Sequence, residues 1–310
     1  MEMLQILRNY SLTLILFFLP INTHSNDFEV KEVENNIFVH FGVHEDANKL
    51  NNGDICNIGF IIGKKSVLVV DPGGTPKIAE KLIEQIKKKT KLPISHVVIT
   101  HGHPDHFLGS TAFSKYKPIF IGHENLKRSL DMNFNFYKLL QSSNLEDKNI
   151  LKVKPVLPGL IVKKNQSIEI NLGERKVSIQ AWSSGHTDND LSVYDKNTKV
   201  FWSENIFVDR IPSITASILG WKKNLEITKK MEISKIVPGH GPIMKKDSAI
   251  EPMLKYFNRI IDQVRILHKN GLDLEYAQKN VAKKNLEGWL LFDIYHKSNI
   301  TKAYTELEWE

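Results

Sequence analysis

The sequence contains a single cysteine, so no disulfide can form within the chain. Cys56 follows Asp54 and Ile55 in an apolar stretch, which is typical of a buried thiol with a structural role. The chain also has no low-complexity tract and no internal repeat, which excludes fibrous and solenoid architectures. With 310 residues of ordinary globular composition, it is long enough for one large core or two modest ones.

The sequence also lacks a concentrated basic region, although its net charge is +7. Short lysine clusters are scattered along the chain, at 87–89, 222–223 and 229–230. A nucleic-acid-binding surface would gather such clusters on one face, with aromatic residues between them. We therefore expect the lysines to be solvated and expect no nucleic-acid partner.

The N-terminal apolar run is too short to cross a bilayer comfortably, which takes about 20 residues. It covers Leu12 to Ile21, with Arg8 before it and small or polar residues at 23–25. This order predicts a signal peptide over residues 1–25, with an uncleaved anchor as the alternative. No cysteine lies at the junction, so we expect no lipid anchor. We expect a periplasmic or secreted protein without stable membrane insertion after cleavage.

The densest concentration of chemically versatile side chains follows the apolar run Ile94–Ile99. In this metal loop, residues 100–109, four metal-competent side chains occur within six residues: His101, His103, Asp105 and His106. Imidazole and carboxylate together suit zinc or iron and need no thiolate. Gly102 and Pro104 predict a turn on which these groups converge. A solvated histidine-rich loop is the alternative, and the density of ligands favours a metal site.

The apolar pattern around the metal loop predicts alternating strands and helices, as in an α/β layer. Thr75 and Pro76 have the residue types of an N-cap and a first helical residue. Residues 142–158 are irregular and form a candidate flap over the site. Strands are predicted at 37–41, 58–62, 67–70, 94–99, 119–121 and 235–237, with a strand-rich block at 160–202. Helices are predicted from 76, at 124–141 and 215–232, and from 249 to the end.

Two more turns present a histidine beside glycine, at His186 and His240. The order of all three turns resembles the metallo-β-lactamase superfamily. The resemblance is carried by residues 100–106, 185–187 and 238–241, and it extends to the segment Val70–Gly74.

The resemblance implies an α/β (α+β) fold, the αββα sandwich, with two zinc ions at its open edge. The sandwich would occupy residues 26–248, with a helical C-terminal extension at 249–310 packed on it. His101, His103 and His186 would hold the first metal, and Asp105, His106 and His240 the second. Asp71 would orient a ligand histidine. Initiation of the turn before Pro72 is the alternative role for Asp71.

One position departs from the superfamily pattern. The family usually has an aspartate that bridges the metals, or a cysteine in one lactamase group, where this chain has Glu204. A glutamate can ligate zinc, but its extra methylene moves the carboxylate oxygens. Either Glu204 bridges the metals from a shifted backbone, or the second site is weaker and the protein works with one metal. We expect the bridging role.

The implied chemistry is hydrolysis by a metal-bound hydroxide, with Asp105 as the catalytic residue that orients it or accepts its proton. Di-iron members of the superfamily have glutamate at the position of His103, so the imidazole there favours zinc. The expected substrate is a small ester, thioester, lactone or amide. Arg210 is a candidate for binding an anionic substrate group, with a surface ion pair to Asp209 as the alternative.

A narrower resemblance covers nearly the whole predicted mature chain. Several stretches are similar to the quinoprotein relay system zinc metallohydrolases and to SoxH-like exported proteins, among them 40–45, 52–60, 186–191, 207–212, 291–296 and 305–310. Three other functions stay open for this fold. They are a mono-iron persulfide oxygenase, a β-lactamase, and a non-catalytic binder whose second metal site has decayed.

Overall fold

The computed structural model describes residues 28–283 and 289–310. The predicted signal peptide therefore lies outside the described residues. Among those residues, the helices are all too short or too polar to span a bilayer.

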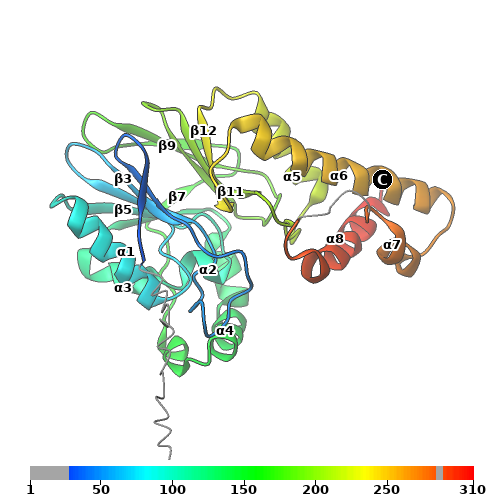
Figure 1. The fold of residues 1–310 in the computed structure, drawn as a ribbon, viewed down its shortest axis with the longest axis horizontal. Coiled ribbons are helices and arrows are strands. Elements are labelled where there is room, and N and C mark those ends of the chain that lie inside the picture. The colour runs from blue at the N-terminus through cyan, green and yellow to red at the C-terminus, as the bar shows by residue number, and fades with distance from the viewer. Residues whose placement is uncertain (1–27, 284–288) are drawn as a thin grey trace, which may run out of the picture.

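Two β-sheets form the centre of the molecule (Figure 1). The first has the order β1-β2-β3-β4-β5-β6-β7, antiparallel through β4 and parallel from β4 to β7. The second has the order β12-β11-β10-β9-β8 and is antiparallel except for the pair β11–β12. The strands of the first sheet are Lys31–Glu34, Ile37–His40, Ile58–Ile62, Val67–Val70, Ile94–Val98, Ile119–His123 and Leu160–Val162. Those of the second, from β8 to β12, are Ser167–Asn171, Lys176–Ala181, Leu191–Asp195, Val200–Phe207 and Lys235–His240.

Helices cover the outer face of each sheet. The first sheet carries α1 (Pro76–Lys89), α3 (Ser110–Phe113) and α4 (Leu126–Asn144). The second carries α5 (Ile218–Lys229) and α6 (Lys246–Lys269). The remaining helices are α2 (Pro104–Phe107), α7 (Leu274–Asn280), α8 (Phe292–Leu307), and the short 3-10 turns η1 (Ser114–Tyr116) and η2 (Lys148–Lys152). The predicted α/β fold, an αββα sandwich followed by C-terminal helices, is confirmed.

Strand β4 explains why the layers stack in this order. All four of its residues are buried, and side chains alternate between the two faces of a strand. Val67 and Val69 belong to the core under α1, whereas Leu68 and Val70 belong to the core between the sheets. A continuous apolar strand of this kind is stable only with a layer on each side.

Most helices and strands lie where the local sequence pattern predicts them. Thr75 caps α1, accepting a hydrogen bond from the Ile78 backbone N at 3.2 Å, and Pro76 is the first helical residue. Strand β12 extends beyond the predicted 235–237 because its pairing with β11 continues to the pair Phe207 and His240. The C-terminal helical region begins at Lys246, before the predicted 249. The segment 142–158 is irregular as predicted, apart from the end of α4 and η2.

Candidate metal centre

The predicted ligands lie on turns that meet at one edge of the sandwich. The metal loop follows β5, His186 lies between β9 and β10, and His240 ends β12. The Leu191 backbone N donates to the Thr100 carbonyl at 2.7 Å, which joins the metal loop to the second sheet. Residues far apart in the sequence are thereby brought into one site.

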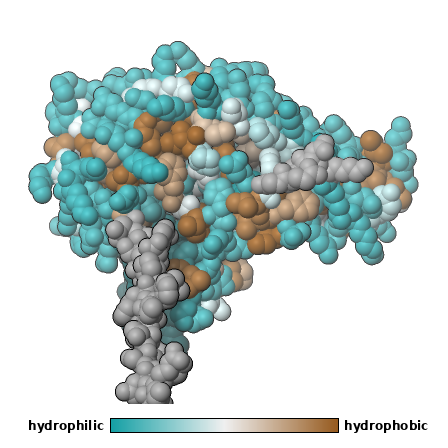
Figure 2. Space-filling model, in the orientation of Figure 1, coloured by the Kyte–Doolittle hydropathy of each residue, from teal (hydrophilic) through white to brown (hydrophobic). Residues whose placement is uncertain are grey.

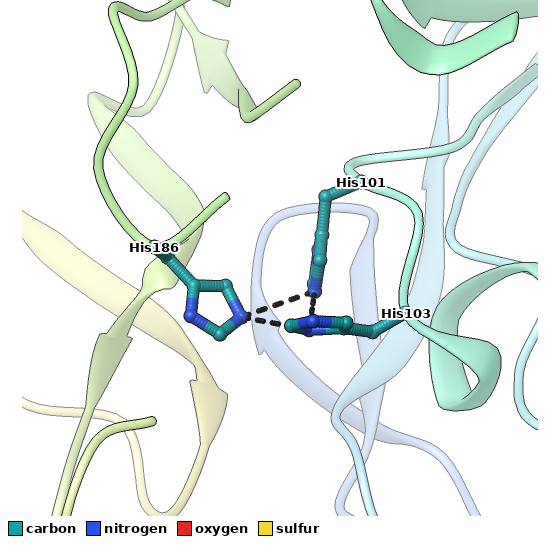
Figure 3. Close-up of side chains that lie close together, drawn as sticks. All are labelled: His101, His103 and His186. Carbon is teal, nitrogen blue, oxygen red and sulfur yellow. Dashed lines mark hydrogen bonds between the residues drawn. The ribbon is translucent and has the colours of Figure 1, made fainter. Parts of the chain in front are cut away.

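Three imidazoles converge on a common point (Figure 3). His103 Nδ1 lies 2.9 Å from His101 Nε2 and 3.0 Å from His186 Nε2, and these last two atoms are 3.2 Å apart. We call these residues the three-histidine group. Its three nitrogens form a nearly equilateral triangle, the arrangement of ligand atoms around one cation.

In His101 and His186, the hydrogen bond of the ring nitrogen that faces away from the site shows that the other nitrogen carries a lone pair. His186 Nδ1 lies 2.8 Å from the Ser213 carbonyl, which only accepts, so Nδ1 is the donor. Thr100 Oγ1 donates to Asp71 at 2.7 Å and therefore accepts from His101 Nδ1 at 3.2 Å. The Nε2 atoms of both histidines are left with lone pairs that point at each other. A cation between them resolves this conflict.

Burial keeps these imidazoles neutral. Together with the neighbouring imidazoles, it holds the pKa of His101 and of His186 well below the usual range. Burial also lowers the pKa of His103 to about 4. Neutral imidazole is the form that binds a metal, so the donor set fits zinc.

Asp105, His106 and His240 form a second cluster, the Asp105 group. Asp105 Oδ2 lies 3.1 Å from His106 Nε2 and 3.6 Å from His240 Nε2. His240 Nδ1 lies 2.7 Å from the Ile55 carbonyl, which only accepts, and 3.3 Å from Arg210 Nη1. The shorter contact makes Nδ1 the donor, so Nε2 keeps a lone pair. The ring centroids of His101 and His106 are 4.2 Å apart, so the two groups adjoin.

Asp71 supports the Asp105 group from behind. Its side chain is fully buried and accepts from the Thr100 backbone N at 2.8 Å, Thr100 Oγ1 at 2.7 Å and His106 Nδ1 at 2.8 Å. The last contact orients the His106 ring, with Nε2 toward Asp105. Burial raises the pKa of Asp71, and His106 and Thr100 oppose that rise.

Glu204 lies elsewhere than we expected for a bridging ligand. Its Oε2 is 3.4 Å from His106 Nδ1, the ring nitrogen bonded to Asp71 and opposite the one that faces Asp105. Its Oε1 accepts from Trp202 Nε1 at 2.8 Å. Trp202 is two residues earlier on the same face of β11, so its indole holds the longer glutamate side chain away from the converging ligands. Glu204 thus belongs to neither group, but its carboxylate lies within 4.8 Å of the ligand atoms of Asp71 and His106. Its role as a metal ligand stays a prediction.

Cys56 lies beneath the metal loop. Its burial is confirmed, and its Sγ donates to the Asp105 carbonyl at 3.0 Å. The sulfur also lies within 4.8 Å of ligand atoms of Asp105 and His106. The sequence marked Cys56 only as a buried thiol, because nothing local connects it with residues almost fifty positions away.

A cavity of about 410 Å³ opens onto both groups. The metal-loop side chains His103 and Asp105 line it, together with His186 and His240. Helix α4 contributes Tyr137, Leu140, Gln141 and Asn144, and α8 contributes Tyr295, Ser298 and Asn299. The sequence pattern did not predict the contribution of α8, because its polar residues belong to no ligand motif.

Arg210 is a buried cation in this cavity. Its guanidinium packs between the rings of Phe207 and Tyr295, at 5.5 and 5.4 Å from their centroids. Among the described residues, no carboxylate forms an ion pair with it, and its Nε has no hydrogen-bond partner. Arg210 is buried while Asp209 is exposed, and no ion pair joins them, so the structure does not show the alternative of a surface ion pair.

Comparisons with known proteins agree with this geometry. A profile of the Metallo-beta-lactamase superfamily matches residues 51–240. The chain is 23% identical over 238 residues to a metallo-beta-lactamase type 2 of Bacillus sp. (strain 170), covering 73% of this chain and 81% of that one. It is 22% identical over 237 residues to a metallo-beta-lactamase type 2 of Bacillus cereus, covering 72% and 80%.

Solved structures show the same fold. A metallo-beta-lactamase from Pontibacter korlensis has a TM-score of 0.56 at 17% identity, covering 74% of this chain and 98% of that one. The stereoselective inverting sec-alkylsulfatase Pisa1 from Pseudomonas sp. has a TM-score of 0.69 at 14% identity, covering 89% of this chain and 50% of that one. The family match spans more than half of the chain and includes all the predicted ligands. This chain belongs to the metallo-β-lactamase superfamily, whose members are metal-dependent hydrolases.

Proposed function

We propose that the protein is an exported zinc-dependent hydrolase that acts on a small ester, thioester, lactone or amide. The observation that carries the proposal is the three-histidine group, with nitrogens 2.9 to 3.2 Å apart. His101, His103 and His186 would hold the first zinc, and Asp105, His106 and His240 the second. Bound zinc supplies a Lewis acid and lowers the pKa of water to about 7.

The side chains around the zinc sites have separate tasks. Asp105 would be the proton acceptor, because its carboxylate lines the cavity beside His103 and His106. Burial raises its pKa, but His106 outweighs burial and holds that pKa below the usual range, so the carboxylate stays charged. Asp71 orients His106, and His106 contacts Asp105, so these residues would keep two ligands of a second zinc in place.

Arg210 would bind an anionic group of the substrate. It is 3% exposed, lines the cavity and has no carboxylate partner among the described residues. A buried guanidinium with a free N–H is well suited to a carboxylate or sulfate. The preferred substrates are therefore acids that also contain the scissile bond.

Within the superfamily, we place the chain with the quinoprotein relay system zinc metallohydrolases and SoxH-like proteins. The support is the similarity of segments such as 207–212 and 291–296, which contain Arg210 and Tyr295 of the cavity. The apolar run 12–21 supports export to the periplasm or secretion.

The test is hydrolysis of a panel of esters, thioesters, lactones and amides by the zinc-loaded protein. We expect His103→Ala to lower kcat by about a hundredfold or more and to lose one zinc, because it removes a corner of the three-histidine group. His96→Ala is the matched control, since His96 lies on β5 but outside both groups, and it should change neither value.

Other outcomes assign other functions. Nitrocefin turnover exceeding that of every ester would make the protein a β-lactamase. One iron per chain with oxygen uptake on a persulfide would make it an oxygenase. Tight zinc binding without turnover of any panel member would make it a binder.

A further inference from the structure

Helix α4 carries an exposed row of apolar side chains that its own packing does not use. Met132, Phe136, Leu139 and Leu140 are 70%, 62%, 61% and 41% exposed. Their spacing places them along one side of the helix. Figure 2 shows apolar surface in the region where Figure 1 places α4. A contiguous exposed row of this kind marks a site of interaction.

The row is not needed to hold α4 on the sheet. Another side of the helix buries Leu126, Leu130 and Phe134 in the core that also contains α1. Replacing exposed members of the row therefore tests binding without removing core contacts.

The row continues into the metal-centre cavity. Leu140 belongs to both, because it lines the cavity and is the last member of the row. Tyr137 also lines the cavity, and its ring centroid lies 6.2 Å from that of His103. An apolar path thus leads from the three-histidine group along α4 to the surface.

Arg210, the guanidinium that lines the cavity, lies against a different helix. Arg210 packs against Tyr295 of α8, whereas the apolar path follows α4. A ligand that satisfies both features has an anionic group at one end and an apolar chain at the other.

We infer that the substrate is an anionic amphiphile, with its acid group at Arg210 and an alkyl or acyl chain along Tyr137, Leu140 and the exposed row. This inference rests on the proposed hydrolase function and deepens it. For an ester, the oxygen of water adds to the acyl carbon and the acyl C–O bond breaks. The departing oxygen takes a proton, which gives an acid and an alcohol.

The test uses 4-acyloxybenzoates, which have a carboxylate on the leaving group and an acyl chain of variable length. Between about four and ten acyl carbons, kcat/KM should rise about twofold per methylene, since each one is partly buried against the row. The methyl esters of the same benzoates should react more slowly, because they lack the charge that Arg210 binds. All concentrations are kept below micelle formation.

Phe136→Ser combined with Leu139→Ser should flatten the dependence on chain length. Ile266→Ser is the matched control, since Ile266 on α6 is 57% exposed and lies outside the row. It should keep the wild-type dependence. Equal kcat/KM for all chain lengths in the wild type, or an unchanged slope in the double variant, would overturn the inference.

Calorimetry of decanoate and butanoate binding distinguishes a failure of this inference from a failure of the proposed function. If no ester is hydrolysed but decanoate binds more tightly to the wild type than to the double variant, the chain site stands and the hydrolase proposal falls. If kcat/KM does not depend on chain length, and the wild type forms a dimer whereas the double variant is a monomer, the row is a contact surface for a second copy of the chain. If kcat/KM does not depend on chain length and the protein sediments with phosphatidylglycerol vesicles, the row is a contact surface for a lipid bilayer. Either result contradicts the inference.

Discussion

At the scale of single residues, three histidines of the candidate metal centre each use one ring nitrogen for a supporting hydrogen bond. His186, His240 and His106 use Nδ1 to donate to Ser213, Ile55 and Asp71, respectively. For His186 and His240 this leaves Nε2 as an acceptor that is aimed into the site. The Nε2 of His106 faces the Asp105 carboxylate at 3.1 Å; burial lowers the pKa of His106, but Asp105 and Asp71 outweigh burial and raise that pKa above its usual range. The acceptors are backbone carbonyls or a buried carboxylate, so the imidazoles are oriented before a metal binds.

Glu204 is the residue on which the number of metals was expected to depend. Its placement behind His106 predicts that Glu204→Gln retains both zinc ions. The glutamine Oε1 can still accept from Trp202 Nε1, and the side chains of both groups are unchanged. Zinc per chain is measured by mass spectrometry after dialysis, with Asp105→Asn as the variant that should lose the second zinc.

A Glu204→Gln protein with one zinc per chain would contradict this placement. It would restore the bridging role that the family pattern suggested. Equal zinc content in the wild type and in both variants would mean that Asp105 is not a ligand either.

The convergence of the candidate ligands could be predicted from the sequence, but the direction of the Glu204 side chain could not. His101, His103, Asp105 and His106 follow a strand within six residues, so local geometry brings them together. The direction of Glu204 depends on the indole of Trp202 and on the position of His106, which comes from the other sheet. Only the tertiary arrangement determines that contact.

At the scale of elements, helix α8 holds the segment that orients His186. The Asn299 amide accepts from Ile214 N at 2.8 Å and donates to the Pro212 carbonyl at 2.6 Å. These two residues flank Ser213, whose carbonyl accepts from His186 Nδ1. Asn299 is 1% exposed, so these hydrogen bonds are shielded from water. The C-terminal helices thus take part in the metal centre.

Glu306 of the same helix fixes the end of this segment. Its carboxylate accepts from Ser217 Oγ at 2.6 Å and from Ile218 N at 2.7 Å, at the N-terminus of α5. A carboxylate there satisfies free N–H groups and interacts favourably with the helix dipole.

We therefore predict that Asn299→Leu weakens zinc binding by the three-histidine group by about tenfold, the lower end for loss of an outer contact. Competition with a chromophoric chelator, at a temperature where both proteins are folded, measures the change. Lys302→Ala on the exposed side of α8 is the control and should leave zinc affinity unaltered. A lower Tm for Asn299→Leu with unchanged zinc affinity would contradict the prediction and would mean that α8 stabilises the fold without affecting zinc binding.

The sequence predicted that α8 is helical but not which face it presents to the site. Its apolar residues give a helical pattern, whereas Tyr295, Ser298 and Asn299 read as ordinary polar positions. Their role follows from packing of α8 on α6, α7 and α5.

At the scale of the whole molecule, the sandwich supplies the metal ligands and the C-terminal helices supply one wall of the cavity. The sandwich could be predicted because ligand motifs and strand patterns recur in the family order. The cavity could not be predicted, because its volume and its lining depend on how α4 and α8 are placed relative to the ligand turns.

The metal content of the purified protein tests the central claim most directly. Mass spectrometry should find about two zinc ions per chain, one for each group of ligands. Removing them with a chelator should abolish ester hydrolysis, and adding zinc back should restore it. Iron as the only bound metal, or hydrolysis that persists without any metal, would contradict the zinc hydrolase proposed for this fold.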